Sequence, residues 1–200
     1  TLGFKFDEAF DLIASEVKNV QENVGLCEVN GFNRIEITGS DRHNFLDRIF
    51  CGNIKKQTGK VGLGYFLNHH GMLKGEATIA NLPESDRGPA RVWYGSAAAS
   101  EYHDMDWLRQ HLNPVEDVQL KSLTNDLTIL VLAGPNARKV LSACSRGDWS
   151  KDAFPWLSRI KMGQKNHRTA DHSQQITCNK QAVCMINRQH MQQCIVACKL

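Results

Sequence analysis

The fold is set by the stretch Arg34-Ile-Glu-Ile-Thr-Gly-Ser-Asp41. Ile35 and Ile37 alternate with polar residues, as in a strand that buries one face. Gly39 interrupts the alternation, and Ser40 or Asp41 can cap a helix. The apolar face of that helix consists of Phe45, Leu46, Ile49 and Phe50. The stretch therefore predicts a strand, a tight turn and a packed helix.

The flanking residues extend this pattern in both directions. Before it, apolar side chains recur every three to four residues and predict an amphipathic helix: Phe6, Phe10, Ile13, Val17, Val20 and Val24. After it, residues 62–68 and 72–80 are expected to form two strands joined at His69-His70-Gly71, with a third strand at 91–95. Together they predict an antiparallel meander.

The second half repeats the alternation of strand and helix. A helical stripe ends at Asn113-Pro114 and consists of Tyr102, Met105, Leu108 and Leu112. A short strand at 118–120, a buried strand at 127–133 and a helix at 136–144 follow. The order of elements predicts an α+β fold, with antiparallel sheets, packed helices and split βαβ-like units.

Composition narrows the classes of protein. The chain has 200 residues, of which 42% are hydrophobic, and this suits one globular domain or a piece of a larger chain. Its net charge of +3 is spread along the sequence, so we expect no nucleic-acid partner. The longest apolar run, residues 127–133, is too short to span a membrane. The chain starts with Thr1, so we expect it to be processed or excerpted from a longer one.

The last 38 residues differ from the rest. They contain four of the seven cysteines, no aromatic residue and no sustained strand period. The sequence therefore predicts a domain at residues 1–162 and an unrelated, disordered tail at residues 163–200.

Glu76 is the main candidate for chemistry. In the predicted strand, alternation places Lys74, Glu76 and Thr78 on one face. A carboxylate beside a hydroxyl can stabilise a cation or accept a proton. The alternative is an ordinary solvated strand face.

No metal site is expected. His69 and His70 are adjacent, so in a strand they point to opposite faces. The set His190, Cys194 and Cys198 would share one helix face, but three ligands are too few for a structural zinc site. The turn Gly134-Pro135-Asn136 either binds an anion at a helix start or only connects a strand to a helix.

Several ordered motifs carry a resemblance to a known family. They are Val24-Gly-Leu-Cys-Glu28, Ile37-Thr-Gly-Ser-Asp41, Phe45-Leu-Asp-Arg48, Phe66-Leu-Asn68, Gly71-Met-Leu-Lys-Gly-Glu-Ala-Thr78, His103-Asp-Met-Asp-Trp107 and Ala133-Gly-Pro-Asn-Ala-Arg-Lys-Val-Leu141. Over residues 5–162 the sequence resembles the aminomethyltransferase domain of the glycine-cleavage T-protein. Within that family it is most similar to the folate-binding domain of dimethylglycine and sarcosine dehydrogenases.

The resemblance implies tetrahydrofolate as the cofactor. In the parent oxidoreductases of one-carbon metabolism, a preceding flavin domain makes an iminium from an N-methyl glycine, and the folate domain captures its carbon as methylenetetrahydrofolate. Glu76 matches the family's acidic residue, and Thr78 matches a neighbouring folate contact. FAD would belong only to the N-terminal domain, whose Gly-x-Gly-x-x-Gly motif is absent here. The implied location is the mitochondrial matrix in a eukaryote and the cytoplasm in a bacterium.

The sequence also departs from the family. Leu63 stands where T-proteins commonly have a tyrosine that contacts the pterin, and the family's later Tyr-Thr-Gly-Glu-Leu-Gly segment is missing. Two expectations follow. The chain is a fragment of a folate-dependent transfer enzyme that is inactive in isolation, or it is a non-catalytic remnant that binds folate or a protein partner through an incomplete sheet face.

Overall fold

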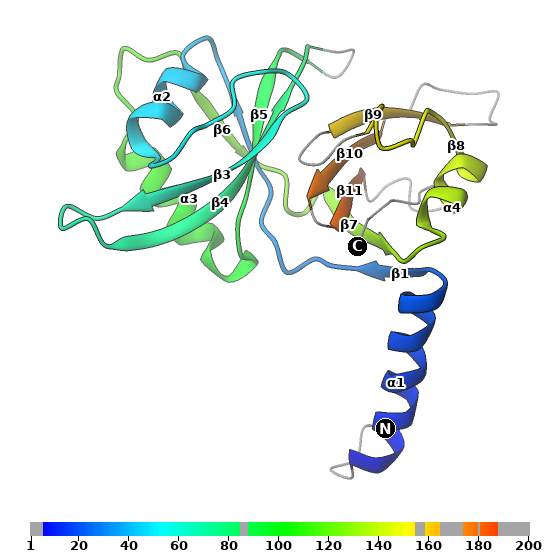
Figure 1. Ribbon diagram of the computed structural model, residues 1–200. Helices are drawn as coiled ribbons and strands as arrows, with labels where there is room; N and C mark the ends of the chain where they lie inside the picture. The colour runs from blue at the N-terminus through cyan, green and yellow to red at the C-terminus, as the bar shows by residue number, and fades with distance from the viewer. Residues whose placement is uncertain (1–5, 85–87, 155–158, 165–173, 180, 188–200) are drawn as a thin grey trace.

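The computed structural model describes residues 6–84, 88–154, 159–164, 174–179 and 181–187 (Figure 1). Its helices are α1 (Phe6–Glu22), α2 (Arg42–Ile49), the short 3-10 helix η1 (Ala98–Ser100), α3 (Glu101–Gln110) and α4 (Ala137–Cys144). Its strands are β1 (Gly25–Glu28), β2 (Ile35–Thr38), β3 (Val61–Leu67), β4 (Leu73–Leu82), β5 (Arg91–Gly95), β6 (Gln119–Ser122), β7 (Leu127–Ala133), β8 (Ser145–Arg146), β9 (Arg159–Gln164), β10 (Gln174–Asn179) and β11 (Gln181–Asn187).

A five-stranded antiparallel sheet is built around the predicted meander. Its strand order is β3-β4-β5-β2-β6, and β3, β4 and β5 follow one another in the sequence. Strands β5 and β6 flank β2 and are joined through α3, so β5–α3–β6 is a split βαβ unit. The α+β class with antiparallel sheets, predicted from the sequence, is confirmed.

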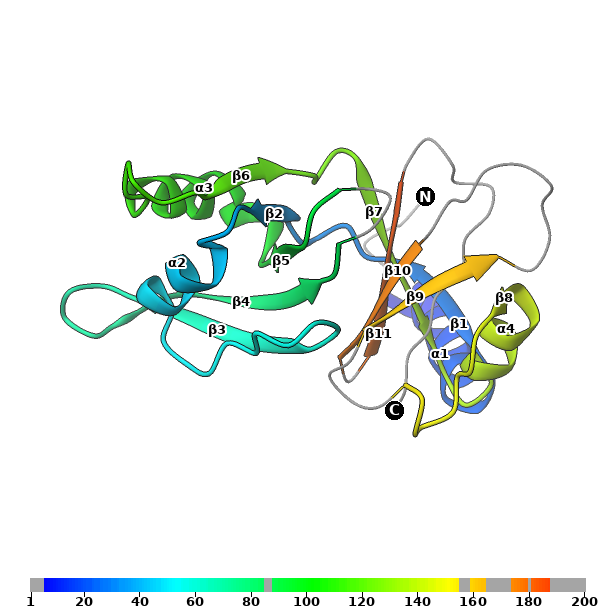
Figure 2. The same ribbon diagram turned by 90° about the horizontal axis from the view of Figure 1, so that it is seen from above.

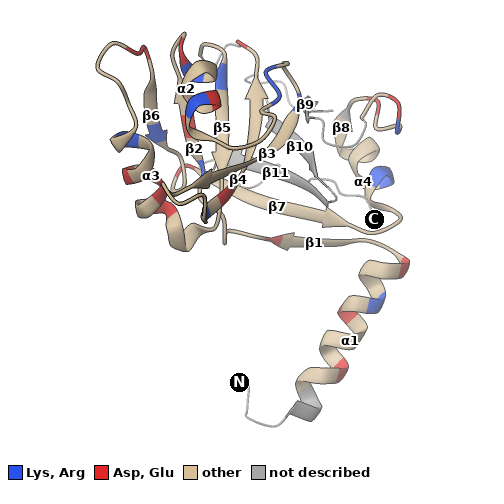
Figure 3. Ribbon diagram, turned by 60° about the vertical axis from the view of Figure 1, so that its left-hand side comes forward, with Lys and Arg blue, Asp and Glu red and all other residues tan. Residues whose placement is uncertain are grey.

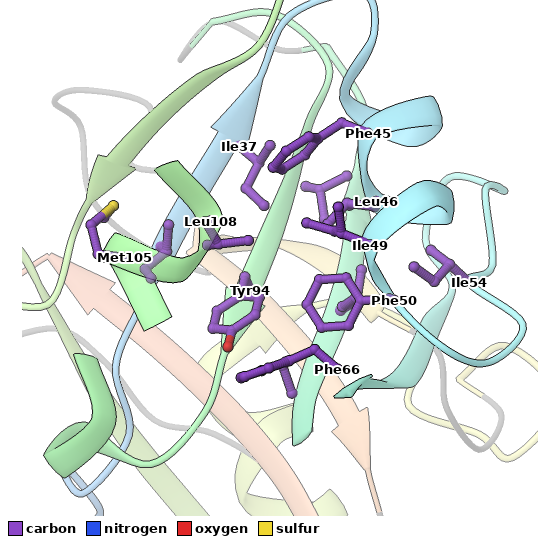
Figure 4. Packing of buried hydrophobic residues seen from close by; sticks show 14 residues of the cluster. Ile37, Phe45, Leu46, Ile49, Phe50, Ile54, Phe66, Tyr94, Met105 and Leu108 are labelled. Atoms are coloured by element: carbon purple, nitrogen blue, oxygen red, sulfur yellow. The ribbon is translucent and has the colours of Figure 1, made fainter. Parts of the chain in front are cut away.

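Helices α2 and α3 cover one face of this sheet and close the main core (Figure 4). The residues predicted for the α2 face meet the inward side chains of the strands. The fully covered members of this core include Ile35, Ile37, Phe45, Leu46, Val92 and Leu108. Burial of apolar area on this scale is the main stabilising contribution to the fold.

The turn between β2 and α2 is fixed by the residues before β6. Asp41 occupies the N-cap position of α2, but its carboxylate accepts a hydrogen bond from the Asp117 backbone N–H at 3.0 Å and makes no cap bond to the helix. Ser40 donates its backbone N–H and its hydroxyl to the Asp117 carboxylate, at 2.8 and 3.0 Å. These bonds hold the pKa of Asp117 below its usual value. The capping expected from the sequence is thus replaced by a link between two distant loops.

A second, six-stranded sheet has the order β1-β7-β11-β10-β9-β8. Gly25 pairs with Ala133 and Glu28 with Leu130, so two segments that are far apart in the sequence lie together. Figures 1 and 2 show this sheet beside the five-stranded one.

Strands β10 and β11 differ from what the sequence analysis predicted beyond Met162. There the lack of aromatic residues and of a sustained strand period indicated no strand, but β11 pairs with β7 from Val183 to Asn187 and β10 pairs with β9. The reason is that strand pairing needs only backbone donors and acceptors, which β7 and β9 supply. Three residues considered above as possible metal ligands lie outside the described residues: His190, Cys194 and Cys198.

Helix α1 projects from the edge of the six-stranded sheet (Figure 1). Directly after the helix, the Asn23 carbonyl accepts a hydrogen bond from the Asn136 backbone N–H at 3.0 Å. Farther out, the side chains of Phe10, Ile13 and Val17 are 63%, 54% and 49% exposed. Among the described helices, none has both the length and the apolar composition that a bilayer span requires.

Candidate functional site

Glu76 lies on the face of the five-stranded sheet that α2 and α3 do not cover. Its neighbours Ala77 and Ile79 point into the main core, so alternation along β4 turns Glu76 and Thr78 to the opposite face. The Glu76 side chain is exposed, and Thr78 is half-buried. The structure therefore places the two predicted residues together on one face, two positions apart.

Cross-strand pairing identifies the neighbours of both residues. Glu76 is directly opposite Tyr65 of β3, and such pairs have Cβ atoms roughly 5 Å apart. Thr78 is flanked by Leu63 of β3 and by Gly95 of β5. We call the face formed by Leu63, Tyr65, Glu76, Thr78 and Gly95 the β3–β5 face.

Next to Thr78, the β3–β5 face continues into buried apolar packing. The next row of paired residues, Val61, Ala80 and Trp93, is buried in a second core cluster. That cluster includes Leu127 at the start of β7, and strand β10 lies beside β3. Thr78 is thus at the rim of the contact between the two sheets, and Glu76 is one row farther out, in solvent.

The surroundings of Glu76 leave its carboxylate available. Among the described residues, the carboxylate has neither a hydrogen-bond partner nor an ion-pair partner within the contact distances. Gly95, the partner of Thr78 on β5, contributes no side chain, and a Cβ built there meets only the Asn33 carbonyl oxygen, at 3.5 Å. The face thus offers an unpaired carboxylate, a hydroxyl and a position without a side chain.

Glycine at position 75 shapes the opposite side of the same strand. A Cβ at Gly75 would lie 2.4 Å from the ring of Phe66, so the ring lies directly on the backbone next to Glu76. Phe66 also stacks on Trp107 of α3, with ring centroids 4.5 Å apart. This packing fixes the backbone that carries Glu76.

A buried polar cluster lies on the helix side of the sheet, and the sequence analysis missed it. Asp104 of α3 is 2% exposed and accepts hydrogen bonds from the Asn33 amide at 3.2 Å and from the Ser96 and Ser100 hydroxyls, the last at 3.1 Å. Burial and the negative charge of Asp104 raise the pKa of Tyr94. The signal for this cluster in the sequence is weak, because its members are far apart along the chain.

The other residues considered from the sequence lie elsewhere. His69 and His70 are at the exposed tip of the β3–β4 hairpin, where the His70 backbone N–H donates to the Asn68 side chain at 3.0 Å. Within the described part of the chain, no group of three or more His, Cys, Asp or Glu side chains could hold a metal. A surface depression of about 450 Å³ is lined by Asp47 and residues 52–57 and does not include Glu76.

Charged residues of both signs are interspersed along the helices and loops (Figure 3). In the turn considered as an anion site, the Asn136 backbone N–H is already bonded to Asn23. That turn therefore works as a connector between β7, α4 and the end of α1.

Comparisons with known proteins agree with this geometry. A family model described as the GCVT N-terminal domain matches residues 2–170. Sarcosine oxidase subunit alpha of Rhizobium meliloti (strain 1021) is 35% identical over 150 residues, which are 73% of this chain and 15% of that protein. Mitochondrial dimethylglycine dehydrogenase of Homo sapiens is 30% identical over 164 residues, 82% of this chain and 18% of that protein. The chain therefore spans less than a fifth of the length of these relatives.

A solved structure shows the same fold. It is the glycine cleavage system aminomethyltransferase T from Bartonella henselae, which superposes with a TM-score of 0.64 at 16% identity. The superposition covers 92% of this chain and 44% of that one.

Proposed function

Because the chain belongs to the GCVT N-terminal domain family, we propose that it is a tetrahydrofolate-binding module of an enzyme similar to dimethylglycine dehydrogenase or sarcosine dehydrogenase. In such an enzyme the module captures the carbon of an N-methyl group as methylenetetrahydrofolate. The names of two similar proteins, a sarcosine oxidase subunit and a dimethylglycine dehydrogenase, support this choice of amine class.

The observation that carries the proposal is the free carboxylate of Glu76 beside the Thr78 hydroxyl and the bare backbone of Gly95. A flat ligand with several N–H groups fits such a face, because the carboxylate can accept their hydrogen bonds and can offset the charge of an incoming iminium, and Gly95 adds no side chain. When bound, tetrahydrofolate would supply the nitrogen atoms that accept the one-carbon unit. The residues present fit that group.

Glu76 has two roles in this proposal. Its negative charge would stabilise the iminium cation. Its carboxylate oxygen would accept a proton from a folate N–H as the carbon bonds to the folate nitrogen, and would return that proton to the amine nitrogen, whose bond to the carbon breaks as the amine leaves. Thr78, two residues from Glu76, donates a hydrogen bond from its hydroxyl to the ligand and so fixes the orientation of the ligand. Oxidation of the amine, which needs FAD, is assigned to another domain of the parent enzyme. We place that enzyme in the mitochondrial matrix of a eukaryote or the cytoplasm of a bacterium.

Calorimetric titration with tetrahydrofolate tests the proposal. We expect saturable binding that Glu76→Gln weakens about tenfold, the order of one charged hydrogen bond. Glu16→Gln is the matched control, because Glu16 is an exposed residue of α1 and the substitution makes the same chemical change. No binding by a chain that unfolds cooperatively would contradict the proposal, and equal binding by the Glu76 variant would contradict the role of that residue.

The second candidate is a non-catalytic module that binds a protein partner. The exposed apolar residues of α1 favour it, since a helix with Phe10, Ile13 and Val17 in water lacks the burial that normally stabilises an amphipathic helix. Gel filtration and ultracentrifugation of the purified chain distinguish the two. A strictly monomeric chain that binds tetrahydrofolate supports the first candidate.

A further inference from the structure

The β3–β5 face contains an aromatic side chain whose position the proposed function does not use. Tyr65 is directly opposite Glu76 in the β3–β4 pairing, and it is half-buried. Its neighbours Gly64 and Phe66 point into the main core, where a Cβ at Gly64 would contact Phe50 and Ile79 at 3.0 Å. The Tyr65 side chain therefore lies on the same face as the Glu76 carboxylate.

Tyr65 has an exposed apolar neighbour on the same face. Leu63, two residues before it on β3, is 49% exposed. Alternate residues of a strand are roughly 7 Å apart, so Leu63 and Tyr65 form one apolar surface beside the Glu76 carboxylate. An apolar, aromatic surface next to a carboxylate suits a flat ring that carries N–H groups.

From this geometry we propose that Tyr65 is a ligand-contacting residue of the folate site. Its ring stacks on the ring system of tetrahydrofolate, while Glu76 across the strand pair faces the nitrogen atoms. The assignment rests on the proposed function and adds the residue that orients the ligand. The aromatic face holds the ring plane, so the nitrogen atoms stay within reach of the carboxylate.

Three variants separate an aromatic contact from simple packing. Tyr65→Phe keeps the ring, Tyr65→Leu keeps apolar bulk without the ring, and Tyr102→Leu makes the same change at a tyrosine that is 88% exposed on α3. For tetrahydrofolate we expect Tyr65→Leu to weaken binding about tenfold, the usual loss when an aromatic platform is removed. Tyr65→Phe and Tyr102→Leu should stay within about threefold of the wild type.

A second measurement uses the wild-type chain, so the result does not depend on a variant that folds. The chain has three tyrosines, and labelling their rings with carbon-13 gives three resolvable signals. Tetrahydrofolate should shift the signal of Tyr65 and leave those of Tyr94 and Tyr102 in place. Binding with no shift at Tyr65, or unchanged affinity in a folded Tyr65→Leu, overturns this assignment alone. Absence of any binding by the wild type overturns the proposed function and this assignment together.

Discussion

At the scale of single residues, the burial of Tyr94 makes the free energy of unfolding depend on pH. It is 1% exposed, and its pKa is raised by burial and by the negative charge of Asp104. In the unfolded chain a tyrosine ionises near its ordinary pKa of about 10. The folded chain therefore keeps the proton to higher pH than the unfolded chain does.

The sign of the effect follows from proton linkage. Below pH of about 10 both states hold the proton and Tyr94 makes no pH-dependent difference. Above that pH the unfolded state loses its proton first, so the free energy of unfolding falls as pH rises. We therefore expect the urea midpoint of Tyr94→Phe to fall less between pH 7 and pH 11 than the midpoint of the wild type does. Parallel curves for the variant and the wild type would rule out the linkage.

The sequence was sufficient to place some residues of the candidate site and insufficient for others. Glu76 and Thr78 could be placed on one face because alternation in a strand is a local rule. The Asp104 cluster could not be predicted, because Asn33 and Ser96 reach Asp104 only after β5 and α3 have packed. Tyr65 was missed for the same reason, since its closeness to Glu76 depends on the register of β3 against β4.

At the scale of elements, the turn from β2 to α2 depends on one glycine. Gly39 has φ of 103°, and a Cβ there would lie 1.9 Å from the Asp117 carbonyl oxygen. We expect Gly39→Ala to lower the free energy of unfolding by about 2–3 kcal/mol, from backbone strain and the displaced loop before β6. Gly31→Ala is the control, because nothing lies within 4 Å of a Cβ at Gly31.

Urea unfolding at neutral pH measures both glycine variants. The prediction fails if the two midpoints coincide. The expected difference in stability includes the hydrogen bonds from Ser40 to the Asp117 carboxylate, because a Cβ at Gly39 would displace Asp117.

The elements that the sequence predicted well are those with a strong period or a clear break. The meander of β3, β4 and β5 and the helices α2 and α3 lie within a few residues of their expected positions. Strands β10 and β11 were not expected, because pairing with β7 and β9 is a tertiary interaction that apolar periodicity does not encode. The domain boundary after Met162 stays a prediction, and comparing the unfolding of residues 1–162 with that of the full chain tests it.

At the scale of the whole molecule, α1 should dominate the exposed apolar surface. Phe10, Ile13 and Val17 recur at intervals of three and four residues, so they line one side of the helix. We expect the double variant Ile13→Ser, Val17→Ser to reduce binding of a hydrophobic fluorescent dye by about half. Its melting temperature should stay within about 2 °C, because these side chains are outside both core clusters.

Val115→Ser is the control for the dye experiment. Val115 is 91% exposed but lies alone in the loop before β6. Its removal should leave the dye signal unchanged. An undiminished signal in the α1 variant would show that the dye binds another surface.

The pairing of β1 with β7 also sets the order in which the chain can fold. Every strand of the five-stranded sheet lies between these two partners in the sequence. On a ribosome, the meander with α2 and α3 can therefore assemble as soon as β6 emerges, while β1 waits for a strand not yet synthesised. Closing so long a loop is slow, since its entropy must be lost before the contacts form. The surface that carries Glu76 and Tyr65 is thus expected to be among the first parts of the nascent chain to acquire its native shape.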